Sequence, residues 1–548
     1  MLGVVFKLTL VNILAVAVLS IPQITRKGRW LYQEEVGGGS TRFFIKGIAY
    51  QPQGELHESD DNHFGEPGTF IDPLADAEEC RRDLPILRAA SINTLRVYSV
   101  NSSLNHDECM QAFSNANIYI ILDLSLPIVG SIDRTFPSWS TNIMDVYLAT
   151  IDAFEKYDNV IAYNVGNEVV DNNSTTFGAA PFLKAAARDI KAYLKSLDSQ
   201  RLVGYAAIDG NLTVRKDLAD FLSCGSEETA IDIYGLNEYT WCGSGSSFES
   251  SGYNEDVAQF ADYNVVTYFS EFGCVKAGPR TWTEVGSLFG ENMTSVWSGG
   301  IAFSYFPAES NEGKFGMVAI STNGTSAEVS SELRALGERY RAVNSTNNPS
   351  KDAAMASNYP TFSSSSPFSS ALPGTPNHAG CNCLEVGLTC VVSPVAANNL
   401  DIVGPLIGVA CGLLGENGGS CTEIGSNGLD GSYGRVSGCA PRVKLSYAMS
   451  DYYERQNRRS AACDFNRNAS LNPHASWAES LSDLAVSCLP SPHATGLPRA
   501  FATPRTSRDA SRGPSVNGTL DSLNSSSLPY LVCMLSLSLT LVMASSVL

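Results

Sequence analysis

The chain has 548 residues, which at roughly 100 to 200 residues per domain predicts more than one folded unit. Hydrophobic residues make up 44% and aromatic residues 9%, so a sizeable core is expected and a wholly disordered chain is excluded. With 37 Lys and Arg against 56 Asp and Glu, the net charge is -19, which disfavours nucleic acid and anionic membrane surfaces as partners. A neutral partner fits this balance better.

The first 20 residues are typical of a secretory signal. Lys7 precedes an apolar run at 8–19, and small residues and Pro22 follow it. The 14 cysteines form no CxxC pair, which favours disulfides in an oxidising compartment over zinc binding or thiol redox chemistry. Both features predict a secreted protein.

Residues 24–343 alternate short β-branched and aromatic runs with helical patterns, as repeated βα units do. Helical spacing of apolar residues covers 75–90, 142–157, 179–197 and 331–343. Eight runs predict strands, and they are RFFIKGIAY (42–50), TLRVYSV (94–100), YIILDLS (119–125), VIAYNVGNE (160–168), LVGYAAI (202–208), IDIYGLNEY (231–239), VVTYFSEFG (265–273) and GGIAFSYF (299–306).

Eight strands alternating with helices over this length predict a (β/α)8 TIM barrel, in the α/β class. The competing fold is an open, doubly wound sheet. No GxGxxG motif follows the first strand run to support it.

Residues 344–380 are rich in Ser and Pro and predict a linker without a core of its own. The following stretch, 381–469, predicts a small disulfide-rich module, because it is crowded with cysteines. Apart from Cys381, these are Cys383, Cys390, Cys411, Cys421, Cys439 and Cys463, and the sequence leaves their pairing open.

Residues 470–527 lack periodicity and predict a disordered stalk, in which Cys488 has no evident partner. The last segment, 528–548, is apolar and carries no charge. A polar spacer and the small residues Ser515, Asn517 and Gly518 precede it, which is the layout of a GPI attachment signal. The alternative is a membrane-spanning helix, but no basic residues follow the run to anchor one.

Catalytic groups of such barrels come from the carboxyl ends of the strands. Glu168 ends the fourth run and Glu271 lies near the end of the seventh. Two carboxyl groups facing each other across one mouth are what retaining glycoside chemistry needs, one as acid and one as nucleophile. Either glutamate alone could simply cap the next helix. Other polar or aromatic residues at strand ends are Gln51, Tyr98, Asp123, Asn167, Tyr239 and Tyr305.

Competing site types have little support in the sequence. There is no HExxH, P-loop or GxSxG motif, and the 6 histidines are scattered without ligand spacing. We therefore expect neither a metal site nor a cofactor.

Several stretches resemble the fungal β-1,3-glucanosyltransferases of glycoside hydrolase family 72, the Gas/Gel/Phr type. They are IDPLADAEECRRDLPILRAASINTLRVYSVNSSLNHDECM, YIILDLSLP, YNVGNEV, YGLNEYTWCG and SEFGC. The later stretches CNCL, GSYGRVSGCAPRVKLSYAMSDYY and ACDF resemble the X8, or family 43, carbohydrate-binding module. The resemblance therefore spans both predicted folded units.

The resemblance implies roles where the family's motifs are present. Glu168 in GNEV is then the acid/base, and Glu271 in SEFG is the nucleophile. Asn167 is expected to hold the sugar 2-hydroxyl. Glucan contacts are expected from Gln51, Tyr98, Asp123, Tyr239 and Tyr305, with the two last on the acceptor side. The implied disulfides are Cys80–Cys109, Cys242–Cys274 and Cys224–Cys381.

These inferences predict an enzyme at the outer cell surface, held by a GPI anchor, that cleaves β-1,3-glucan internally and transfers the new reducing end to another glucan chain. Simple endo-hydrolysis shares the first half of this reaction and remains open. A non-catalytic glucan-binding surface protein is a further alternative, but it would not need two carboxylates in an apolar cleft. The oligomeric state is also left open.

Overall fold

The computed structural model describes residues 21–35, 37–56, 67–127, 130–310, 312–397, 399–475 and 480–491. The predicted signal (1–20), most of the predicted stalk and the apolar tail (528–548) lie outside the described residues. Within the described residues, no helix is long and apolar enough to cross a membrane.

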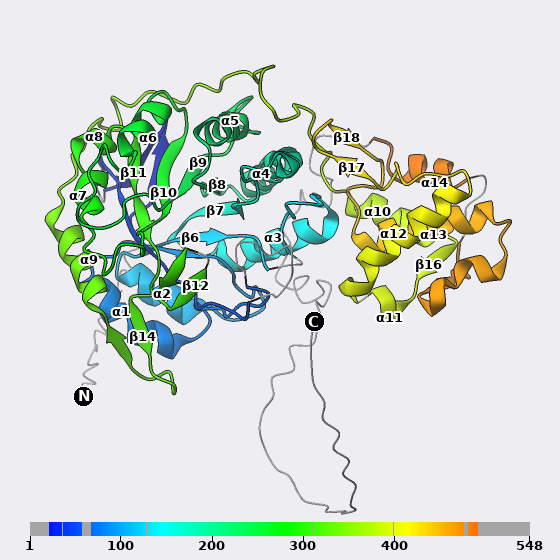
Figure 1. Ribbon diagram of the computed structural model, residues 1–548, viewed down its shortest axis with the longest axis horizontal. Coiled ribbons are helices and arrows are strands. Elements are labelled where there is room, and N and C mark those ends of the chain that lie inside the picture. The colour runs from blue at the N-terminus through cyan, green and yellow to red at the C-terminus, as the bar shows by residue number, and fades with distance from the viewer. Residues whose placement is uncertain are drawn as a thin grey trace, which may run out of the picture.

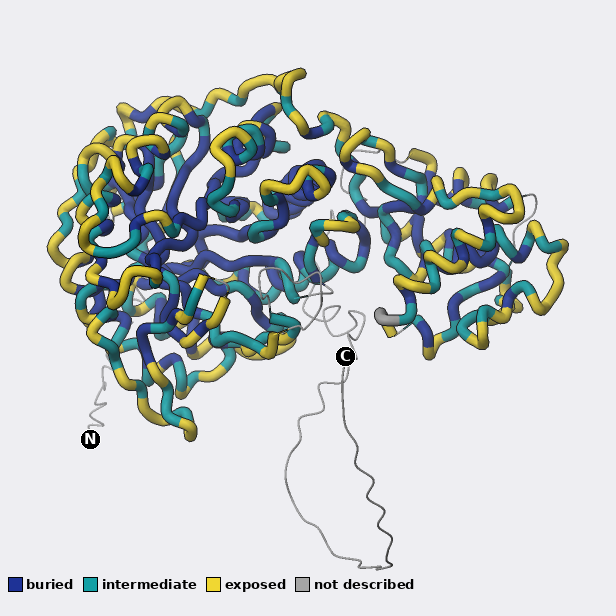
Figure 2. The backbone as a smooth tube through the Cα atoms, in the orientation of Figure 1, coloured by how far each residue is buried: buried dark blue, intermediate teal, exposed yellow. Residues whose placement is uncertain are grey.

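The first folded unit is a closed parallel barrel surrounded by helices (Figure 1), as predicted. Each predicted run supplies one barrel strand: β4 (Ile45–Ala49), β5 (Thr94–Val97), β6 (Tyr119–Asp123), β7 (Val160–Asn167), β8 (Leu202–Ile208), β9 (Ile233–Glu238), β10 (Val266–Phe272) and β11 (Trp297–Ala302). These strands are buried on both faces (Figure 2), which is why the runs are continuously apolar rather than alternating.

The helices of the barrel follow the strands and cover their outer side. They are α1 (Ala77–Ala89), α2 (Asp107–Asn115), α3 (Thr141–Phe154), η1 (Ser174–Ala179), α4 (Ala180–Ser196), α5 (Leu212–Ser223), α6 (Tyr253–Phe260), α7 (Glu284–Leu288), α8 (Glu291–Thr294) and α9 (Ser331–Ala342). Two hairpins, β12 (Ala308–Ser310) with β13 (Gly313–Phe315) and β14 (Val318–Ile320) with β15 (Ala327–Val329), lie between β11 and α9.

A three-stranded antiparallel sheet precedes the barrel and covers the amino-terminal ends of its strands. It consists of β1 (Ile24–Lys27), β2 (Trp30–Glu34) and β3 (Ser40–Arg42). Ile24 and Leu31 pack in one cluster with Ile45 and Val266 at the starts of β4 and β10. The opposite end, where the strands terminate, therefore remains for the functional site.

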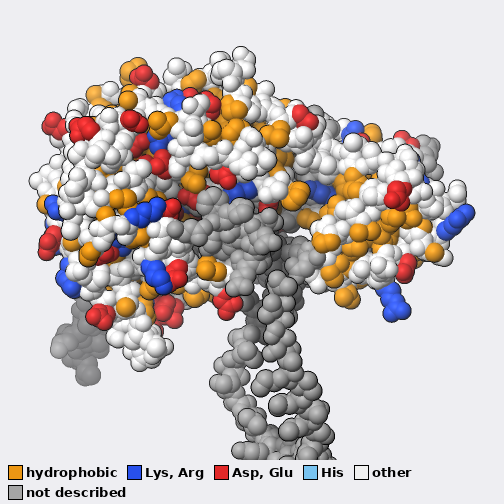
Figure 3. All heavy atoms as spheres, in the orientation of Figure 1, with side chains coloured by type: hydrophobic (Ala, Val, Ile, Leu, Met, Phe, Trp, Pro, Cys, Tyr) orange, Lys and Arg blue, Asp and Glu red, His pale blue; other side chains and the backbone are white. Residues whose placement is uncertain are grey.

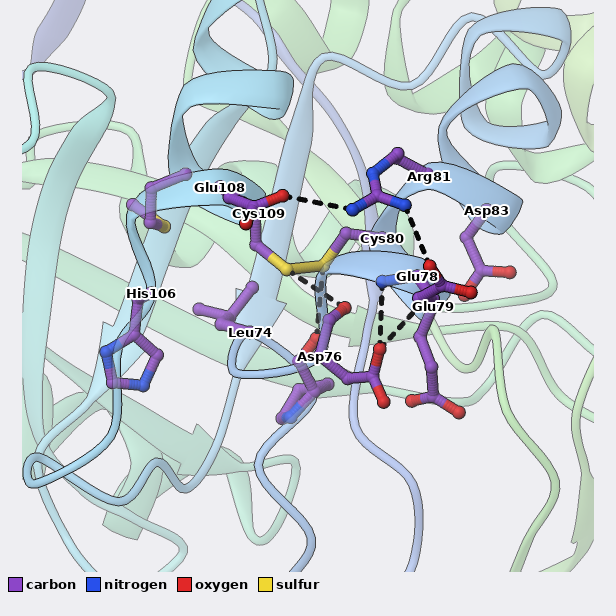
Figure 4. Close-up of a disulfide and its surroundings, with 12 residues drawn as sticks. Leu74, Asp76, Glu78, Glu79, Cys80, Arg81, Asp83, His106, Glu108 and Cys109 are labelled. Atoms are coloured by element: carbon purple, nitrogen blue, oxygen red, sulfur yellow. Dashed lines mark hydrogen bonds and ion pairs between the residues drawn. A yellow bond between two sulfur atoms is a disulfide. The ribbon is translucent and has the colours of Figure 1, made fainter.

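A disulfide between Cys80 and Cys109 joins α1 to α2 (Figure 4). Asp76 caps α1 by accepting hydrogen bonds from the backbone N–H of Glu78 (2.8 Å) and Glu79 (3.1 Å). Since α1 precedes β5 and α2 follows it, this bridge holds the two helices that flank β5. The expected Cys242–Cys274 bridge is formed as well, after β9 and β10.

The expected Cys224–Cys381 bridge is wrong. Cys381 bonds to Cys439 inside the second unit, and Cys224 is a free, buried thiol. The N–H of Gly225 donates to the carbonyl of Pro360, so the later part of the chain lies beside Cys224 at residue 360. It has left Cys224 behind by the time it reaches Cys381. The two cysteines therefore belong to different units.

The predicted linker is packed against the barrel rather than free. We call its residues 344–377 the strap. The strap has neither helix nor strand (Figure 1), but barrel side chains bind its backbone, as when Tyr32 donates to the carbonyl of Pro349 at 3.0 Å. Phe368 is buried between Phe177 and Phe221, with ring centroids 5.3 Å from each. Apolar contacts of this kind and hydrogen bonds to its backbone hold the Ser/Pro-rich stretch against the barrel.

The second unit is a helical module held by four disulfides, Cys381–Cys439, Cys383–Cys488, Cys390–Cys463 and Cys411–Cys421. It contains α10 (His378–Gly387), β16 (Cys390–Val392), α11 (Pro394–Ala397), α12 (Leu400–Glu416), β17 (Ser426–Asn427), β18 (Ser432–Tyr433), α13 (Pro441–Arg455), η2 (Ser460–Cys463), η3 (Phe465–Arg467), β19 (Ala469–Leu471) and α14 (Leu481–Cys488). Cys488 is thus a structural half-cystine, and the module continues beyond the predicted boundary at 469.

The module docks on the barrel beside α3 and α4 (Figure 1). The ring of Tyr433 packs against Phe182 in α4, with centroids 5.6 Å apart, and belongs to the barrel's own core cluster. The N–H of Thr141 at the start of α3 donates to the carbonyl of Gly438 at 3.0 Å. Barrel, strap and module therefore share one buried contact surface.

These pairings predict the relative cost of two cysteine substitutions. Cys488→Ser opens a bridge with a sequence separation of 105, and loops of about 100 residues contribute about 4 to 5 kcal/mol on the loop-entropy account. Cys224→Ser should cost about 1 kcal/mol or less, since a hydroxyl can replace the thiol that donates to the Phe221 carbonyl at 3.2 Å. Thermal unfolding of the two secreted variants measures the difference; an equal or larger loss for Cys224→Ser would contradict the pairing.

Candidate active site

Arg96, on β5, occupies the centre of the barrel's carboxyl end and is fully buried. Its Nη2 donates to Asp123 Oδ2 on β6 and to Asn167 Oδ1 on β7, both at 2.8 Å. Its Nη1 donates to Glu271 Oε1 at 3.2 Å and to the carbonyl of Ser270 at 3.0 Å, both on β10. A longer bond from Nη1 reaches Asn237 Oδ1 on β9 at 3.4 Å. One guanidinium therefore connects five strands of the barrel.

The charge of Arg96 is secured by its neighbours. Burial alone would lower the pKa of this guanidinium, but the nearby Asp123, Tyr98 and Glu271 outweigh it and raise the pKa well above its usual value. Sequence reasoning missed Arg96. The available signal was a charged residue inside the apolar run TLRVYSV, because a buried strand carries a charge only where that charge is paired.

Glu271 is held by three donors at the end of β10. Besides Arg96, the hydroxyls of Tyr98 (2.7 Å, to Oε1) and Tyr239 (2.6 Å, to Oε2) donate to its carboxylate. Burial raises the pKa of Glu271, and these three donors oppose that rise by favouring the ionised form. Burial also raises the pKa of Tyr98 and Tyr239 well above the usual phenol value, so both hydroxyls remain donors.

Glu168 follows β7 and has an unusual backbone conformation, with φ of 51°. Its N–H donates to the carbonyl of Ala206 at 2.9 Å, and its carbonyl accepts from Arg134 Nε at 2.8 Å. A left-handed conformation in a non-glycine residue costs of order 1 kcal/mol or more, and such residues gather at functional sites. The left-handed backbone at Glu168 therefore sets the direction of the Glu168 carboxyl group.

Asn237, at the end of β9, links the two glutamates. Its Nδ2 donates to Glu168 Oε1 at 2.7 Å and to Asn167 Oδ1 at 3.2 Å. Its Oδ1 accepts from Ser270 Oγ at 2.7 Å, next to Glu271. Sequence reasoning also missed Asn237, although its place at a strand end, two residues before Tyr239, was a usable signal.

Two of the predicted glucan-binding residues, Asp123 and Gln51, hold other residues of the site in place. Asp123 is 2% exposed, with its carboxylate taken up by Arg96 and by Asn164 Nδ2 at 2.6 Å. Gln51 accepts from the N–H of Tyr98 (3.2 Å) and Ser99 (3.0 Å), and donates to the carbonyl of Ile71 (2.6 Å). Asp123 thus positions Arg96, and Gln51 positions the backbone at Tyr98. A glucan contact of either side chain stays a prediction.

Tyr305 does not reach the site. It is fully buried, and its ring packs on Tyr50 and Phe306 at centroid distances of 5.2 and 4.9 Å. The half-buried Phe303 lies there in its place, in edge contact with the rings of Tyr98 and Tyr239, each at 6.4 Å. The strand β11 ends at Ala302, so the first residue beyond it faces the site and Tyr305 turns back into the core.

This arrangement can perform two-step glycosyl transfer. Glu271 is a carboxylate surrounded by donors, and Glu168 is a second carboxyl group that follows β7, with β8 and β9 between β7 and β10 around the barrel. Hydrogen bonds through Asn237, Asn167 and Arg96 connect the two glutamates. Among the residues that the structure describes, no group of three or more His, Cys, Asp or Glu side chains is placed to hold a metal ion. The fold and these two glutamates define a carbohydrate-active barrel enzyme.

Comparison with known proteins agrees with this class. Residues 14–344 match the glucanosyltransferase family (Glyco_hydro_72), and residues 388–470 match the X8 domain. The chain therefore belongs to the glycoside hydrolase 72 glucanosyltransferase family, with an X8 module.

Curated relatives match over most of their length. The chain is 36% identical over 473 residues to the 1,3-beta-glucanosyltransferase gas1 of Schizosaccharomyces pombe, covering 85% of this chain and 82% of the relative. It is 37% identical over 466 residues to pH-responsive protein 1 of Candida albicans, covering 83% and 81%.

Solved structures give the same result. A mutant of Saccharomyces cerevisiae Gas2p in complex with laminaritetraose and laminaripentaose superposes with a TM-score of 0.72 at 33% identity, covering 85% of this chain and 98% of that one. The likeness thus includes both folded units.

The donors to Glu271 predict a pH effect. The nucleophile must be ionised, so activity should fall at acid pH as Glu271 gains a proton, at an apparent pKa above that of an ordinary glutamate. Tyr239→Phe removes a bond to the ionised form, so the acid limb should move to higher pH, by about one unit.

The measurement is kcat/KM against pH with laminari-oligosaccharides. Tyr359→Phe is the matched control, because this strap hydroxyl accepts from Arg26 on β1, away from the site. If the acid limb of the Tyr239→Phe profile stayed in place or moved to lower pH, the proposed role of the Tyr239 hydroxyl would be contradicted.

Proposed function

We propose that this protein is a β-1,3-glucanosyltransferase that cleaves a glucan chain internally and transfers the new reducing end to another chain, elongating and remodelling cell-wall glucan. Its family membership and the named activity of its relatives support the proposal. The observation that carries it is the pair Glu168 and Glu271, held in different environments and joined through Arg96 and Asn237.

In the first half of the reaction, a Glu271 carboxylate oxygen attacks the anomeric carbon while Glu168 gives its proton to the departing glycosidic oxygen. The bond from the anomeric carbon to that oxygen breaks, and a glycosyl ester on Glu271 forms. In the second half, Glu168 takes the proton from an acceptor hydroxyl, whose oxygen attacks the same carbon. The ester bond then breaks and Glu271 leaves as a carboxylate.

Asn167 is suited to a sugar contact in this scheme. Its Oδ1 accepts from both Arg96 and Asn237. The atom that it offers to a sugar 2-hydroxyl is therefore Nδ2, and this bond would strengthen in the transition state.

Endo-hydrolysis is the competing activity, with water in place of the acceptor. Water is present at about 55 M, so an acceptor sugar must win by being held in place, and positioning can supply effective molarities of roughly 10⁵ M or more. A non-catalytic glucan binder has less support. A buried cluster of Arg96 and two carboxylates contributes little net stability, and a binder has no use for it, whereas a glycosyl transferase does.

The central test uses Glu168→Gln and Glu271→Gln. Each should abolish turnover of laminari-oligosaccharides while the variant is still secreted and unfolds cooperatively, because each removes one half of the catalytic pair. Glu338→Gln, at an exposed position on α9, is the matched control and should behave as wild type. If Glu271→Gln kept about a tenth or more of the activity, Glu271 would not be the nucleophile.

We also propose that the protein is secreted through its first 20 residues and is held at the outer cell surface by a GPI anchor that replaces 528–548. The apolar tail, the polar spacer and the small residues near Asn517 support this. Phosphatidylinositol-specific phospholipase C should release the protein from membranes into the aqueous phase. Retention in the detergent phase after treatment would favour a spanning segment instead.

A further inference from the structure

Phe136 is the one exposed aromatic residue in the part of the chain that the structure describes, with 84% of its surface accessible. The other described Phe, Tyr and Trp side chains are buried or half-buried. The apolar residues exposed on the module, where hydrophobic side chains gather in Figure 3, are aliphatic, such as Val395 and Val409. A single exposed apolar side chain is ordinary on a protein surface, so this ring is a candidate ligand contact only because of where the fold places it.

The backbone that carries Phe136 is fixed. Asp133 Oδ1 accepts from the N–H of Thr135 (2.7 Å) and of Phe136 (2.6 Å), which closes a tight turn. The turn is anchored on both sides by buried residues, Ile132 before it and Trp139 after it. The indole of Trp139 donates to a carboxylate of α4 at 2.7 Å. The exposure of the ring is therefore part of the fold.

The turn lies against the proposed acid/base. It follows β6, on the end of the barrel that carries the site. Arg134, two residues before Phe136, donates to the carbonyl of Glu168 at 2.8 Å. Of the two catalytic glutamates, this bond joins the turn to Glu168, while Glu271 is surrounded by Arg96, Tyr98 and Tyr239.

The reaction indicates which part of the glucan lies next to this turn. Glu168 protonates the departing oxygen and later deprotonates the acceptor, so the sugar that bears this oxygen lies on the Glu168 side. The flat C–H face of a pyranose matches an aromatic ring, which offers apolar area at little entropic cost. We propose that Phe136 is a stacking platform for the acceptor glucan, and that it determines how well a sugar competes with water. This inference rests on the proposed transferase function.

The test is Phe136→Ala in the full-length secreted protein, with Phe136→Tyr to restore the ring. With laminari-oligosaccharides as donor and acceptor, Phe136→Ala should lower the ratio of lengthened products to hydrolysis fragments about fivefold. This is the loss expected when the acceptor no longer covers roughly half of a phenylalanine's apolar surface. The rate of the first cleavage at saturating donor should change much less, and Phe136→Tyr should behave as wild type. Met355→Ala, which removes another exposed apolar side chain (85%) from the strap, is the matched control.

The outcomes separate this inference from the proposed function. If wild type lengthens chains and Phe136→Ala does so equally well, the stacking role is overturned. If wild type yields only shorter fragments, the transferase proposal fails, and Phe136 is tested by direct binding. In that case Phe136→Ala added to inactive Glu271→Gln should still weaken laminari-oligosaccharide binding about fivefold, because the same platform would hold the departing chain; unchanged binding overturns it.

Discussion

The active site depends on the burial of one guanidinium. Moving Arg96 out of water is costly, and the cost is offset only because Asp123 on β6 and Glu271 on β10 lie beside it as hydrogen-bonded counter-charges, with Asn167 on β7 as a further acceptor. The arrangement is therefore possible only in the closed barrel, since β5, β6, β7 and β10 must all be in place. With both carboxylates ionised, the cluster keeps an excess negative charge, which suits the positive charge that develops on the sugar ring in the transition state.

The register of the barrel strands deviates from regularity where the glutamates emerge. The pairing of β7 with β8 shifts between Asn164 and Asn167, and that of β10 with β9 shifts between Phe269 and Glu271. Such irregularities redirect side chains near active sites. Together with the left-handed backbone at Glu168, they turn residues at the ends of two strands toward one point. Regular strands would alternate these side chains between the barrel interior and the helix layer.

Much of this could be predicted from the sequence, and the failures have a common cause. The eight strands were predictable because each is a continuous apolar run, and the two glutamates were predictable from their place at strand ends and from GNEV and SEFG. The roles of Arg96, Asn237, Asp123 and Gln51 depend on bonds between residues far apart in the chain, such as Arg96 with Glu271, so no local pattern encodes them. The same holds for the pairing of Cys381 with Cys439 in preference to Cys224, which depends on where the strap passes the barrel.

The division of contacts between the two glutamates also locates where transfer and hydrolysis diverge. Arg96, Tyr98 and Tyr239 all bind Glu271, and they stabilise it as a leaving carboxylate equally well whether water or a sugar attacks the ester. Interactions shared by both outcomes cannot favour one of them. Selectivity for the acceptor must therefore come from groups on the Glu168 side, where the incoming oxygen gives up its proton. The turn that contacts the Glu168 carbonyl through Arg134 lies on that side and belongs to neither the Arg96 cluster nor the donors to Glu271.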